Sequence, residues 1–550
     1  MILSNDLIQP HDLDYWKSHV FDSQGKIQEN VWEERDLKFL LPVIQDTFAQ
    51  LLREPVDGTK KRERQIQLAY ASRNAEIICR IASERLGISV SIDLTALQKK
   101  VQVSIKLTHK EELLITTSCS LSHLLDLSYF ETMFRGPSQE TEGELSLDLD
   151  EKEDVEFYRL FFSGVEKGKL LKPTNVKQAC KLLSLGRYFG CPEEFLGPVY
   201  NFIEKTPLQK EEALHLAEHA YRFHSSILQE ILSSCYLSKL NSNEVVSFLD
   251  ELKNRGISFS SLVLKGCKLD APLLAWFKQH ANEITTLDIS SAQLHDPAAW
   301  IEALSNNPSL KVLNISNTRI TTLPQGCLNL EEVYAFDCRL LYDVSGLDNL
   351  KKLRKLMLLW AGITKLPTGC DNLEEVDTSG CVQLVDVSGL DDLKKLRILN
   401  LCHTGIVALP KGCVNLEKDE ASQCVQLDDV SGLDDLKKLR LLILCGTRII
   451  ALPRGCVGLK EVNASQCVQL VDVSGLDDLK KLCTLYLFNT GITALPEGCD
   501  NLEEVDVASC RQLADVRALD NLKRLCRLRL SGSGVFAPPS GCIRLGGSVA

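Results

Sequence analysis

The sequence lacks any long apolar run. No stretch of its 550 residues approaches the roughly 18 consecutive apolar residues that a membrane-spanning helix needs. The first residues, MILSNDLIQPHDLDYW, contain no basic region followed by an apolar segment and small residues, the pattern of a secretory signal. We therefore expect neither a membrane span nor a secretory signal. Hydrophobic residues make up 44% of the chain and charged residues 25%, as in globular proteins.

The sequence also lacks an excess of positive charge. Its net charge is −12, and no stripe of lysine and arginine runs through it, which argues against nucleic acid as the main ligand. The motifs GxSxG and HExxH, a P-loop and a dinucleotide-binding glycine fingerprint in its required context are absent, and the ten histidines are scattered. We expect no catalytic residue, no cofactor and no metal site, and therefore a protein that is not an enzyme.

Cysteine is abundant, but its spacing is not that of the CxxC and CxxH patterns of zinc sites. Eleven of the 21 cysteines fall into two columns with a period of 43 residues: Cys327, Cys370, Cys413, Cys456, Cys499 and Cys542, and Cys338, Cys381, Cys424, Cys467 and Cys510. Such regular cysteines are expected to be small buried side chains in equivalent positions of a stack. Structural thiols indicate a reducing setting, so we expect a cytoplasmic protein.

One phrase recurs through the second half of the chain: LDNLKKL at Leu347, LDDLKKL at Leu390, Leu433 and Leu476, and LDNLKRL at Leu519. A fixed period of this size predicts a solenoid, in which each repeat buries its apolar side against its neighbours. Within each 43-residue period the pattern LxxLxLxx(T/C)x(I/L) occurs twice, and it resembles leucine-rich repeats. We predict a curved, right-handed solenoid over residues 256–550. Its 13 repeats open at Phe259, Ile284, Leu310, Leu330, Leu353, Leu373, Leu396, Leu416, Leu439, Leu459, Leu482, Leu502 and Leu525.

Each repeat has an expected strand and an expected return path. The alternation L-x-L has the period of a strand, so its leucines point inward and the x positions outward. Leu-Pro-x-Gly then closes the repeat, because proline fixes φ and glycine permits the turn. In the return segment we expect Ser388 to cap a short helix, with Asp391 and Asp392 at its positive end and Lys394 and Lys395 at its negative end.

The outward strand positions differ most between these near-duplicate repeats. They hold apolar, aromatic and acidic side chains, and exposed aromatics on a concave sheet suit an interface anchor. The alternative is that these side chains tuck under flanking loops, or are unselected drift after duplication. The candidate partner-binding residues are Tyr334, Phe336, Met357, Trp360, Ile398, Tyr486 and Phe488. We expect Tyr334, Phe336 and Trp360 to form one patch and Tyr486 and Phe488 a second.

Residues 101–206 mix strand and helix patterns. Val101 to Leu107 alternates like an edge strand, a helical stretch ends in LLDLSYFETMFRG, a strand covers Leu145–Leu149, and amphipathic helices follow. The phrases SYFETMF, ELSLDLDEKEDVEFYRLFFSGVEKGKL and NVKQACKLLSLGRYF resemble the BTB/POZ domain. This resemblance implies an α+β core that self-associates or docks a cullin-type ubiquitin ligase. In that family's cullin-binding pattern Glu140 is the docking candidate, but Ser138 occupies the hydrophobic position before it.

The remaining segments are expected to be helical: residues 1–100 form an N-terminal region, and residues 207–255 form a spacer similar to the start of a BACK-type region. The predicted α/β protein is thus a BTB/POZ core plus a leucine-rich-repeat solenoid. We expect an adaptor with a protein partner on the concave face, a possible BTB homodimer and a possible cullin scaffold. The alternative is an effector or scaffold of an intracellular bacterium that acts in the host cytosol without recruiting a ligase.

Overall fold

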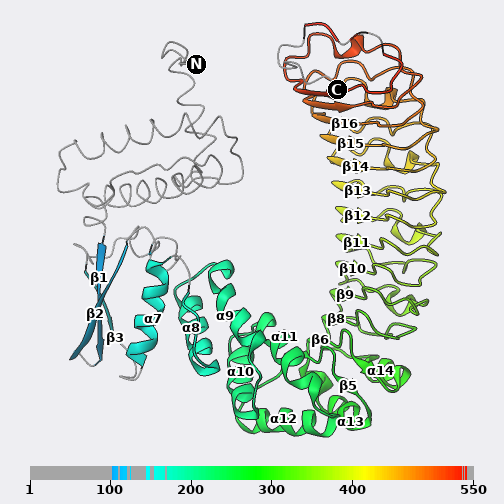
Figure 1. Cartoon of the computed structure of the whole chain (residues 1–550). Helices are drawn as coiled ribbons and strands as arrows, with labels where there is room; N and C mark the ends of the chain where they lie inside the picture. Colours follow the sequence, from blue (N-terminus) through cyan, green and yellow to red (C-terminus); the bar gives the residue numbers. More distant parts are fainter. Residues whose placement is uncertain are drawn as a thin grey trace, which may run out of the picture. The chain divides into compact units, whose positions relative to one another are not determined.

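The computed structural model describes residues 102–109, 112–120, 124, 144–148, 154–167, 170–535, 537 and 539–541. The predictions for residues 1–100 and for Glu140 lie outside these residues. The chain divides into two compact units, 1–207 and 208–550, and Figure 1 shows the described elements of each. The two units are treated separately below.

The first unit contains a three-stranded sheet of β1 (Gln102–His109), β2 (Glu112–Ser120) and β3 (Glu144–Asp148) in the order β2-β1-β3. β1 pairs antiparallel with β2 and parallel with β3. It is therefore a central strand, and the prediction of an edge strand was wrong. The helical stretch predicted after it also begins too early, because β2 occupies Glu112–Ser120. The run Ile115, Thr116, Thr117 is β-branched, which favours a strand.

Three helices follow the sheet: α7 (Val155–Glu166), α8 (Val176–Tyr188) and α9 (Glu193–Lys205). The side chain of Asn175 caps α8 by accepting a hydrogen bond from the backbone N–H of Gln178. Phe161 and Phe189 are fully buried, with their rings stacked 5.4 Å apart. β3, α7 and α8 lie where the sequence predicted a strand and helices. A sheet with helices occurs in many folds, so the BTB/POZ assignment stays a prediction.

The second unit begins with α10 (Lys210–Arg222), α11 (Ser226–Cys235) and α12 (Ser242–Asn254). Leu214, Ala217, Ala220 and Tyr221 on α10 are all buried, as their shared helix face predicted. α11 packs on α10 and on β4 (Ser261–Val263), the first strand of the repeat array. The ring of Tyr221 meets that of Phe259 edge-on at 4.9 Å. These helices therefore cover the apolar end of the array.

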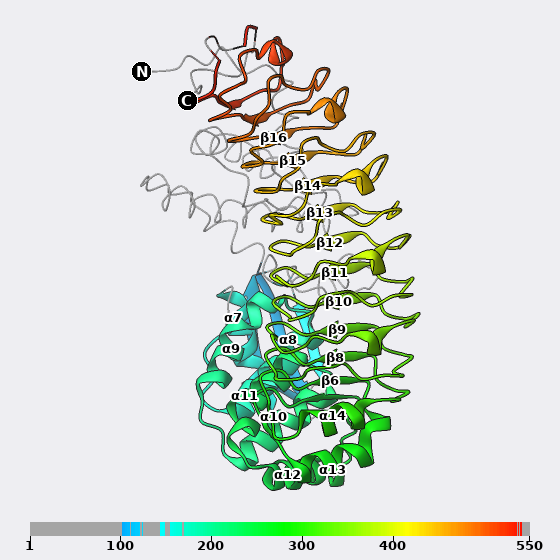
Figure 2. The same ribbon diagram turned by 90° about the vertical axis from the view of Figure 1, so that its right-hand side faces the viewer.

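The array is one parallel sheet of 13 strands. Each strand begins two residues after a predicted repeat opening, so the prediction of 13 repeats is confirmed. After β4 the strands are β6 (Thr286–Asp288), β8 (Val312–Asn314), β9 (Glu332–Tyr334), β10 (Lys355–Met357), β11 (Glu375–Asp377), β12 (Ile398–Asn400), β13 (Lys418–Glu420), β14 (Leu441–Ile443), β15 (Glu461–Asn463), β16 (Thr484–Tyr486), β17 (Glu504–Asp506) and β18 (Arg527–Arg529). In Figures 1 and 2 they stack in chain order along one side of the array.

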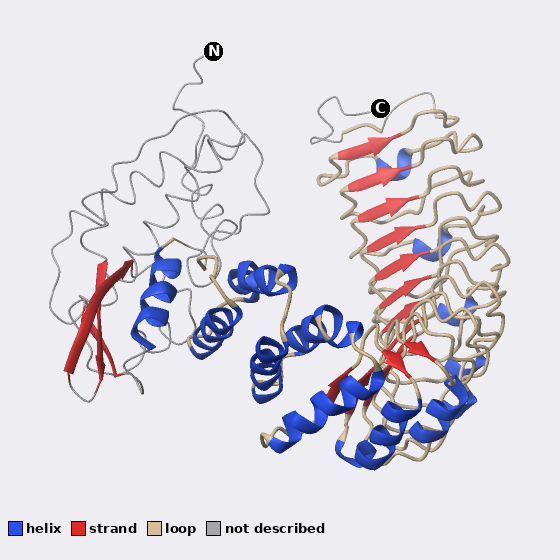
Figure 3. Ribbon diagram, turned by 60° about the horizontal axis from the view of Figure 1, so that its bottom comes forward, coloured by secondary structure: helices blue, strands red, loops and turns tan. Residues whose placement is uncertain are grey.

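The return segments differ between the two ends of the array. In the longer first repeats they contain α13 (Ala271–His280) and α14 (Pro297–Leu304), together with a small sheet of β5 (Lys268–Leu269) and β7 (Gln293–Leu294). Further along they contain short 3₁₀ helices, Ser345–Leu347, Ser388–Leu390, Ser431–Leu433, Ser474–Leu476 and Arg517–Leu519. Figure 3 shows these helices apart from the row of parallel strands.

The predicted charge pattern of the return helix was wrong. Ser388 is the first residue of the 3₁₀ helix rather than its cap, and its backbone N–H donates to the carboxylate of Asp386 at 3.0 Å. Asp391 follows the helix, and its Oδ1 accepts from the backbone N–H of Lys411 in the next repeat at 2.8 Å. These carboxylates satisfy turn N–H groups of the stack, which is a local structural role.

Both cysteine columns are buried wherever the structure describes them, as predicted. The thiol of Cys370 donates to the carbonyl of Leu347 at 3.1 Å, and that of Cys381 to the carbonyl of Leu358 at 3.0 Å. Each of these bonds joins a cysteine to a carbonyl 23 residues earlier. Burial raises the pKa of Cys370 to about 11 and that of Cys381 to about 12. The columns therefore act as neutral thiols that hold consecutive repeats together.

One inward strand position holds an acid. Asp419, at the centre of β13, is fully buried where the neighbouring strands place Leu399 and Leu442. Neither of its carboxylate oxygens has a hydrogen-bond partner among the described residues. Burial, with a smaller contribution from the charge of Glu420, raises the pKa of Asp419 to about 8. The middle of the array therefore holds its carboxyl in the protonated form at neutral pH.

Candidate protein-binding face

The strand face of the array is formed by the first and third residues of each strand and by the residues just after it. In β9 to β16 the central strand residue is buried, whereas the residues on either side of it are partly or fully exposed. This alternation follows from the period of two along a strand. The outward positions predicted from the sequence therefore lie on one continuous face.

Tyr334 and Phe336 form a pair at the start of this face. Their rings meet edge-on with centroids 5.9 Å apart, and Phe336 is 37% exposed. The hydroxyl of Tyr334 donates to Oε2 of Glu332 at 2.6 Å. Burial and this bond raise the pKa of Tyr334, so the phenol stays protonated. The ammonium group of Lys355 lies 5.9 Å from the centroid of the Tyr334 ring. The Tyr334 ring is thus held by its hydrogen bond to Glu332, and Phe336 is the more accessible ring of the two.

Trp360 is the most exposed aromatic of the candidate set, at 54%. It lies in the turn after β10, where its φ is +59°, so the prediction of an outward strand position was wrong. The equivalent positions of other repeats also have positive φ, and they hold small or flexible residues such as Asn317, Gly446 and Asn489. A bulky side chain is unusual in this conformation. No ring contact joins Trp360 to Tyr334 or Phe336 among the described residues, although the backbone N–H of Asp337 donates to the carbonyl of Leu359 at 2.7 Å, so the single patch stays a prediction.

The other candidates are less exposed. Met357 lies in register between Tyr334 and Asp377 and is partly buried. Ile398 is 37% exposed and stands between Glu375 and Lys418 of the adjacent strands.

Tyr486 and Phe488 are both partly buried. Burial and the neighbouring Glu504 raise the pKa of Tyr486. No ring contact between Tyr486 and Phe488 is found in the described part of the chain. The two side chains of the predicted second patch, Tyr486 and Phe488, are therefore only partly accessible to solvent.

Acidic and apolar strands alternate across the face. Carboxylates stand at outward positions of β9, β11, β13, β15 and β17: Glu332, Glu375, Asp377, Glu420, Glu461, Glu504 and Asp506. The intervening strands carry apolar side chains: Met357 on β10, Ile398 on β12, Leu441 and Ile443 on β14, and Tyr486 on β16. Adjacent strands lie about 4.8 Å apart, so the strands with carboxylates recur about every 10 Å along the face, and so do the strands with apolar side chains. The candidate set missed Leu441 and Ile443, although their outward register was readable from the repeat.

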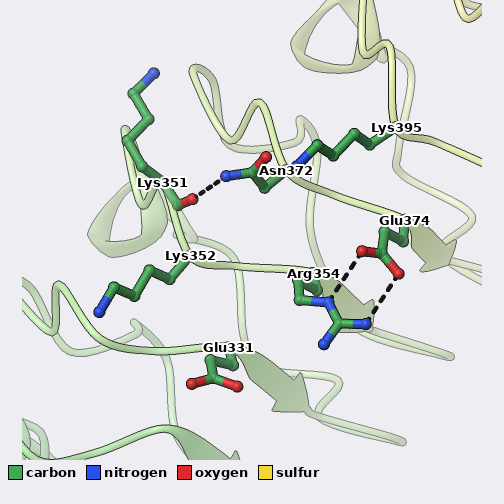
Figure 4. A pocket seen from close by; sticks show the side chains of 7 residues that line it. All are labelled: Glu331, Lys351, Lys352, Arg354, Asn372, Glu374 and Lys395. Carbon is green, nitrogen blue, oxygen red and sulfur yellow. Dashed lines mark hydrogen bonds and ion pairs between the residues drawn. The ribbon is translucent and has the colours of Figure 1, made fainter.

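Two cavities lie where the return segments lead back into the strands. The first, of about 310 Å³, is lined by Glu331, Lys351, Lys352, Arg354, Asn372, Glu374 and Lys395. Figure 4 shows that the guanidinium of Arg354 pairs with Glu374, donating from Nε and Nη2 at 3.0 and 3.1 Å. The second, of about 360 Å³, is lined by the residues 43 positions later in the sequence. Both linings are made of charged and amide side chains, unlike the mostly apolar lining of small-molecule sites.

The described residues contain no group of three or more His, Cys, Asp or Glu side chains that could hold a metal ion. Within the same residues, no helix is long and apolar enough to cross a membrane. The strand face, with its exposed Phe336, Trp360 and Ile398, is the candidate site, because it presents large apolar side chains to solvent.

The array is similar to solved leucine-rich-repeat structures. It shares 18% identity with an internalin from Listeria monocytogenes, over 56% of this chain and 86% of that one, at a TM-score of 0.35. It shares 16% identity with the functional domain of InlJ from Listeria monocytogenes, which includes a cysteine ladder, over 49% and 63% of the two chains at a TM-score of 0.33. It shares 18% identity with the leucine-rich-repeat domain of the type III effector XopL, over 50% of this chain and 93% of that one, at a TM-score of 0.31.

No protein-family model and no curated protein matches the chain. The structural similarities are too distant to say anything about function. The solenoid assignment rests on the 13 parallel strands and their spacing.

Proposed function

We propose that this chain is a non-enzymatic interaction scaffold whose strand face binds a protein partner. The observation that carries the proposal is Trp360, an indole that is 54% exposed at a position with φ +59°. A tryptophan is unfavourable for the fold there, because its backbone is strained and more than half of its surface is exposed to solvent. Large exposed aromatics are the side chains that most often anchor protein interfaces.

The surroundings of Trp360 suit a protein rather than a small ligand. The face is long and unbroken over the strands, and its apolar stripes are separated by carboxylates such as Glu332, Asp377 and Glu461. Lys355 and Lys418 neutralise part of this charge through ion pairs with Glu375 and Glu420 at 2.9 and 2.7 Å. The unpaired carboxylates favour a partner that presents basic side chains beside apolar ones.

A paired-variant capture experiment tests this function. The full chain, Phe336→Ala and Trp360→Asn are each used as bait, and captured proteins are compared by quantitative mass spectrometry. Asparagine stands at the equivalent position of two other repeats, so Trp360→Asn keeps the turn while it removes the ring. Val414→Lys, at an exposed position before the strands, is the control. A partner retained by the control and lost from both face variants is expected; equal capture by all baits contradicts the proposal.

We also propose that residues 101–206 form a BTB/POZ-like core that self-associates or docks a cullin-type ligase. Support comes from the sequence phrases and from the order of β3, α7 and α8. In this reading Glu140 contributes to docking, the repeats select the partner, and the protein acts in the cytoplasm. The alternative is a bacterial effector or scaffold in the host cytosol that recruits no ligase.

A pull-down with purified cullin scaffolds separates these two readings. Retention that is lost in Glu140→Lys, with an unchanged melting temperature, supports the adaptor. No retention of any cullin by the wild-type chain favours the alternative and leaves the strand-face proposal intact.

A further inference from the structure

An exposed apolar area of the array lies beside the strand face, on the flank that follows the strands. Seven β-branched side chains there are between 51% and 68% exposed. They are more exposed than Phe336 or Ile398 on the strand face. We call this surface the valine flank; it comprises Val382, Val425 and Val468, Val385 and Val471, and Val407 and Ile450.

Adjacent repeats contribute neighbouring members of the valine flank. The backbone N–H of Val471 donates to the carbonyl of Ile450 at 3.1 Å. A β-carbon built on Gly405 would lie 3.2 Å from both Cγ1 of Val385 and the carbonyl oxygen of Val382. Val382 and Val385 therefore border the repeat that carries Val407. The flank is one continuous apolar strip over the five repeats that open between Leu373 and Leu459.

Two columns of the strip end in polar residues on both sides, whereas the column of Val385 and Val471 continues on one side into the exposed Tyr342. In the column of Val382, Val425 and Val468, the repeats beyond carry Arg339 and Arg511. In the column of Val407 and Ile450 they carry Thr364 and Thr493. The scaffold therefore accepts polar side chains at these positions, and the apolar ones are not needed for packing. A bounded apolar strip with a polar rim has the anatomy of an interface.

Two opposite charges stand at the middle of the strip. Asp428 takes the place of a valine in the repeat that opens at Leu416, and Arg448 lies in the next repeat. Both side chains are exposed, and neither forms an ion pair with a described residue. The guanidinium of Arg448 donates to the amide oxygen of Gln426 at 3.2 Å. An acid and a base on adjacent repeats of the strip are complementary to the same strip turned by 180° about an axis between those two repeats.

We propose that the valine flank is the interface with a second copy of this chain, packed antiparallel about a two-fold axis between the repeats that open at Leu416 and Leu439. In this arrangement Asp428 of each copy faces Arg448 of the other, and Val407 faces Val468 and Val471. Such an interface is isologous, because each copy uses the same surface. The seven side chains offer an apolar area on the order of 600 Å² per copy, near the roughly 800 Å² per partner of a standard interface.

This association is independent of the strand face, which remains open to a partner. It is also distinct from association through residues 101–206, because that contact would survive changes on the valine flank. A dimer through the flank would present two strand faces together and so raise the avidity for a multivalent partner.

The first test measures the mass of the full chain by sedimentation velocity over a range of micromolar concentrations. The wild type is expected to form a larger species than Val425→Lys with Ile450→Lys over the same range, because association through residues 101–206 would be common to both proteins. Val414→Lys also replaces an exposed apolar side chain with a charged one, but before the strands, and it should sediment like the wild type. The proposal is overturned if the wild type is a monomer throughout, or if the double variant sediments as the same species as the wild type. Circular dichroism melts check that each variant is folded.

The second test uses charge exchange to identify the facing residues. Asp428→Arg places two arginines opposite each other in a homodimer, and Arg448→Asp places two aspartates opposite each other. Each variant alone should associate at least about tenfold more weakly than the wild type. An equimolar mixture should recover dimers, because the heterodimer restores both Asp–Arg contacts across the interface. Failure of the mixture to recover dimers overturns the antiparallel arrangement, since no contact within one chain can produce the recovery.

Discussion

The indole ring of Trp360 lies against the backbone of Gly380 in the next repeat. A β-carbon on Gly380 would lie 2.5 Å from Cδ2 of the indole and 2.7 Å from Cε3, closer than real side chains approach. Both residues occupy the same turn position of consecutive repeats, with φ values of +59° and +77°. The position of the Trp360 ring therefore depends on Gly380, 20 residues later in the chain, because only a residue without a side chain leaves room for the indole.

Gly380→Ala should destabilise the array by roughly 1–3 kcal/mol, because alanine both collides with the indole and adopts a positive φ poorly. In a Trp360→Asn background the collision disappears and only the backbone cost of about 1 kcal/mol should remain. Urea denaturation of the wild type, both single variants and the double variant measures this coupling. Additive effects of the two substitutions would show that ring and glycine do not interact.

Trp360→Asn and Leu399→Ala should have opposite consequences. Leu399 is fully buried at the centre of β12, so its truncation should cost roughly 2–5 kcal/mol. Trp360→Asn relieves a strained turn and should leave the melting temperature unchanged or higher, while it weakens binding of the partner identified by capture. If Trp360→Asn lowers stability as much as Leu399→Ala and spares binding, the ring is structural.

Asp419 should make the stability of the array depend on pH. Its folded pKa of about 8 lies above the ordinary value of 3.8, so between these values the folded state holds a proton that the unfolded state has released. The contribution of Asp419 to stability is therefore most favourable at or below about pH 4, falls as the pH rises, and is fully lost above about pH 8. Asp419→Asn should remove this slope, as measured by melting temperature against that of the wild type at each pH.

Asp419→Val should go further and stabilise the protein at pH 7 by roughly 3–5 kcal/mol, because it also removes an unpaired buried carboxyl. Valine is the inward residue of the strand in several other repeats, including Val376 and Val462. Hydrogen exchange of β13 and its neighbours, measured beside the global melt, should slow in this variant. No gain in either measurement would mean that water or a partner group satisfies the carboxylate.

The cysteine columns should resist alkylation in the folded protein. Cys370 and Cys381 are fully buried with pKa values raised to about 11 and about 12, so little thiolate forms near neutral pH. Iodoacetamide at pH 8 followed by peptide mass spectrometry should modify the exposed Cys526 and spare both columns until the chain is denatured. Rapid labelling of the column cysteines in the native protein would contradict their place in the stack.

The repeat pattern predicted the array well, because its signal is periodic and local. Each strand, from the one after Phe259 to the one after Leu525, needs only inward leucines two residues apart and a turn at a fixed offset. The same reasoning failed for residues 112–120, where it predicted no strand because this segment has no repeat with which to compare it. It also placed Trp360 on a strand, because spacing alone does not reveal a change in the sign of φ.

The sequence by itself determined the number, spacing and inward faces of the repeats. These follow from the alternation of side chains along each strand, with a period of 2, and from the repeat period of 43 residues. Only the tertiary structure decided which outward residues are accessible. Tyr486 is half-covered and Trp360 is open, although both looked equivalent in the sequence. The valine flank likewise exists only in the stack, where Val382 and Val407 come together from successive repeats. Exposure depends on neighbours that lie 20 to 23 residues away in the chain, and a linear pattern does not record what those neighbours cover.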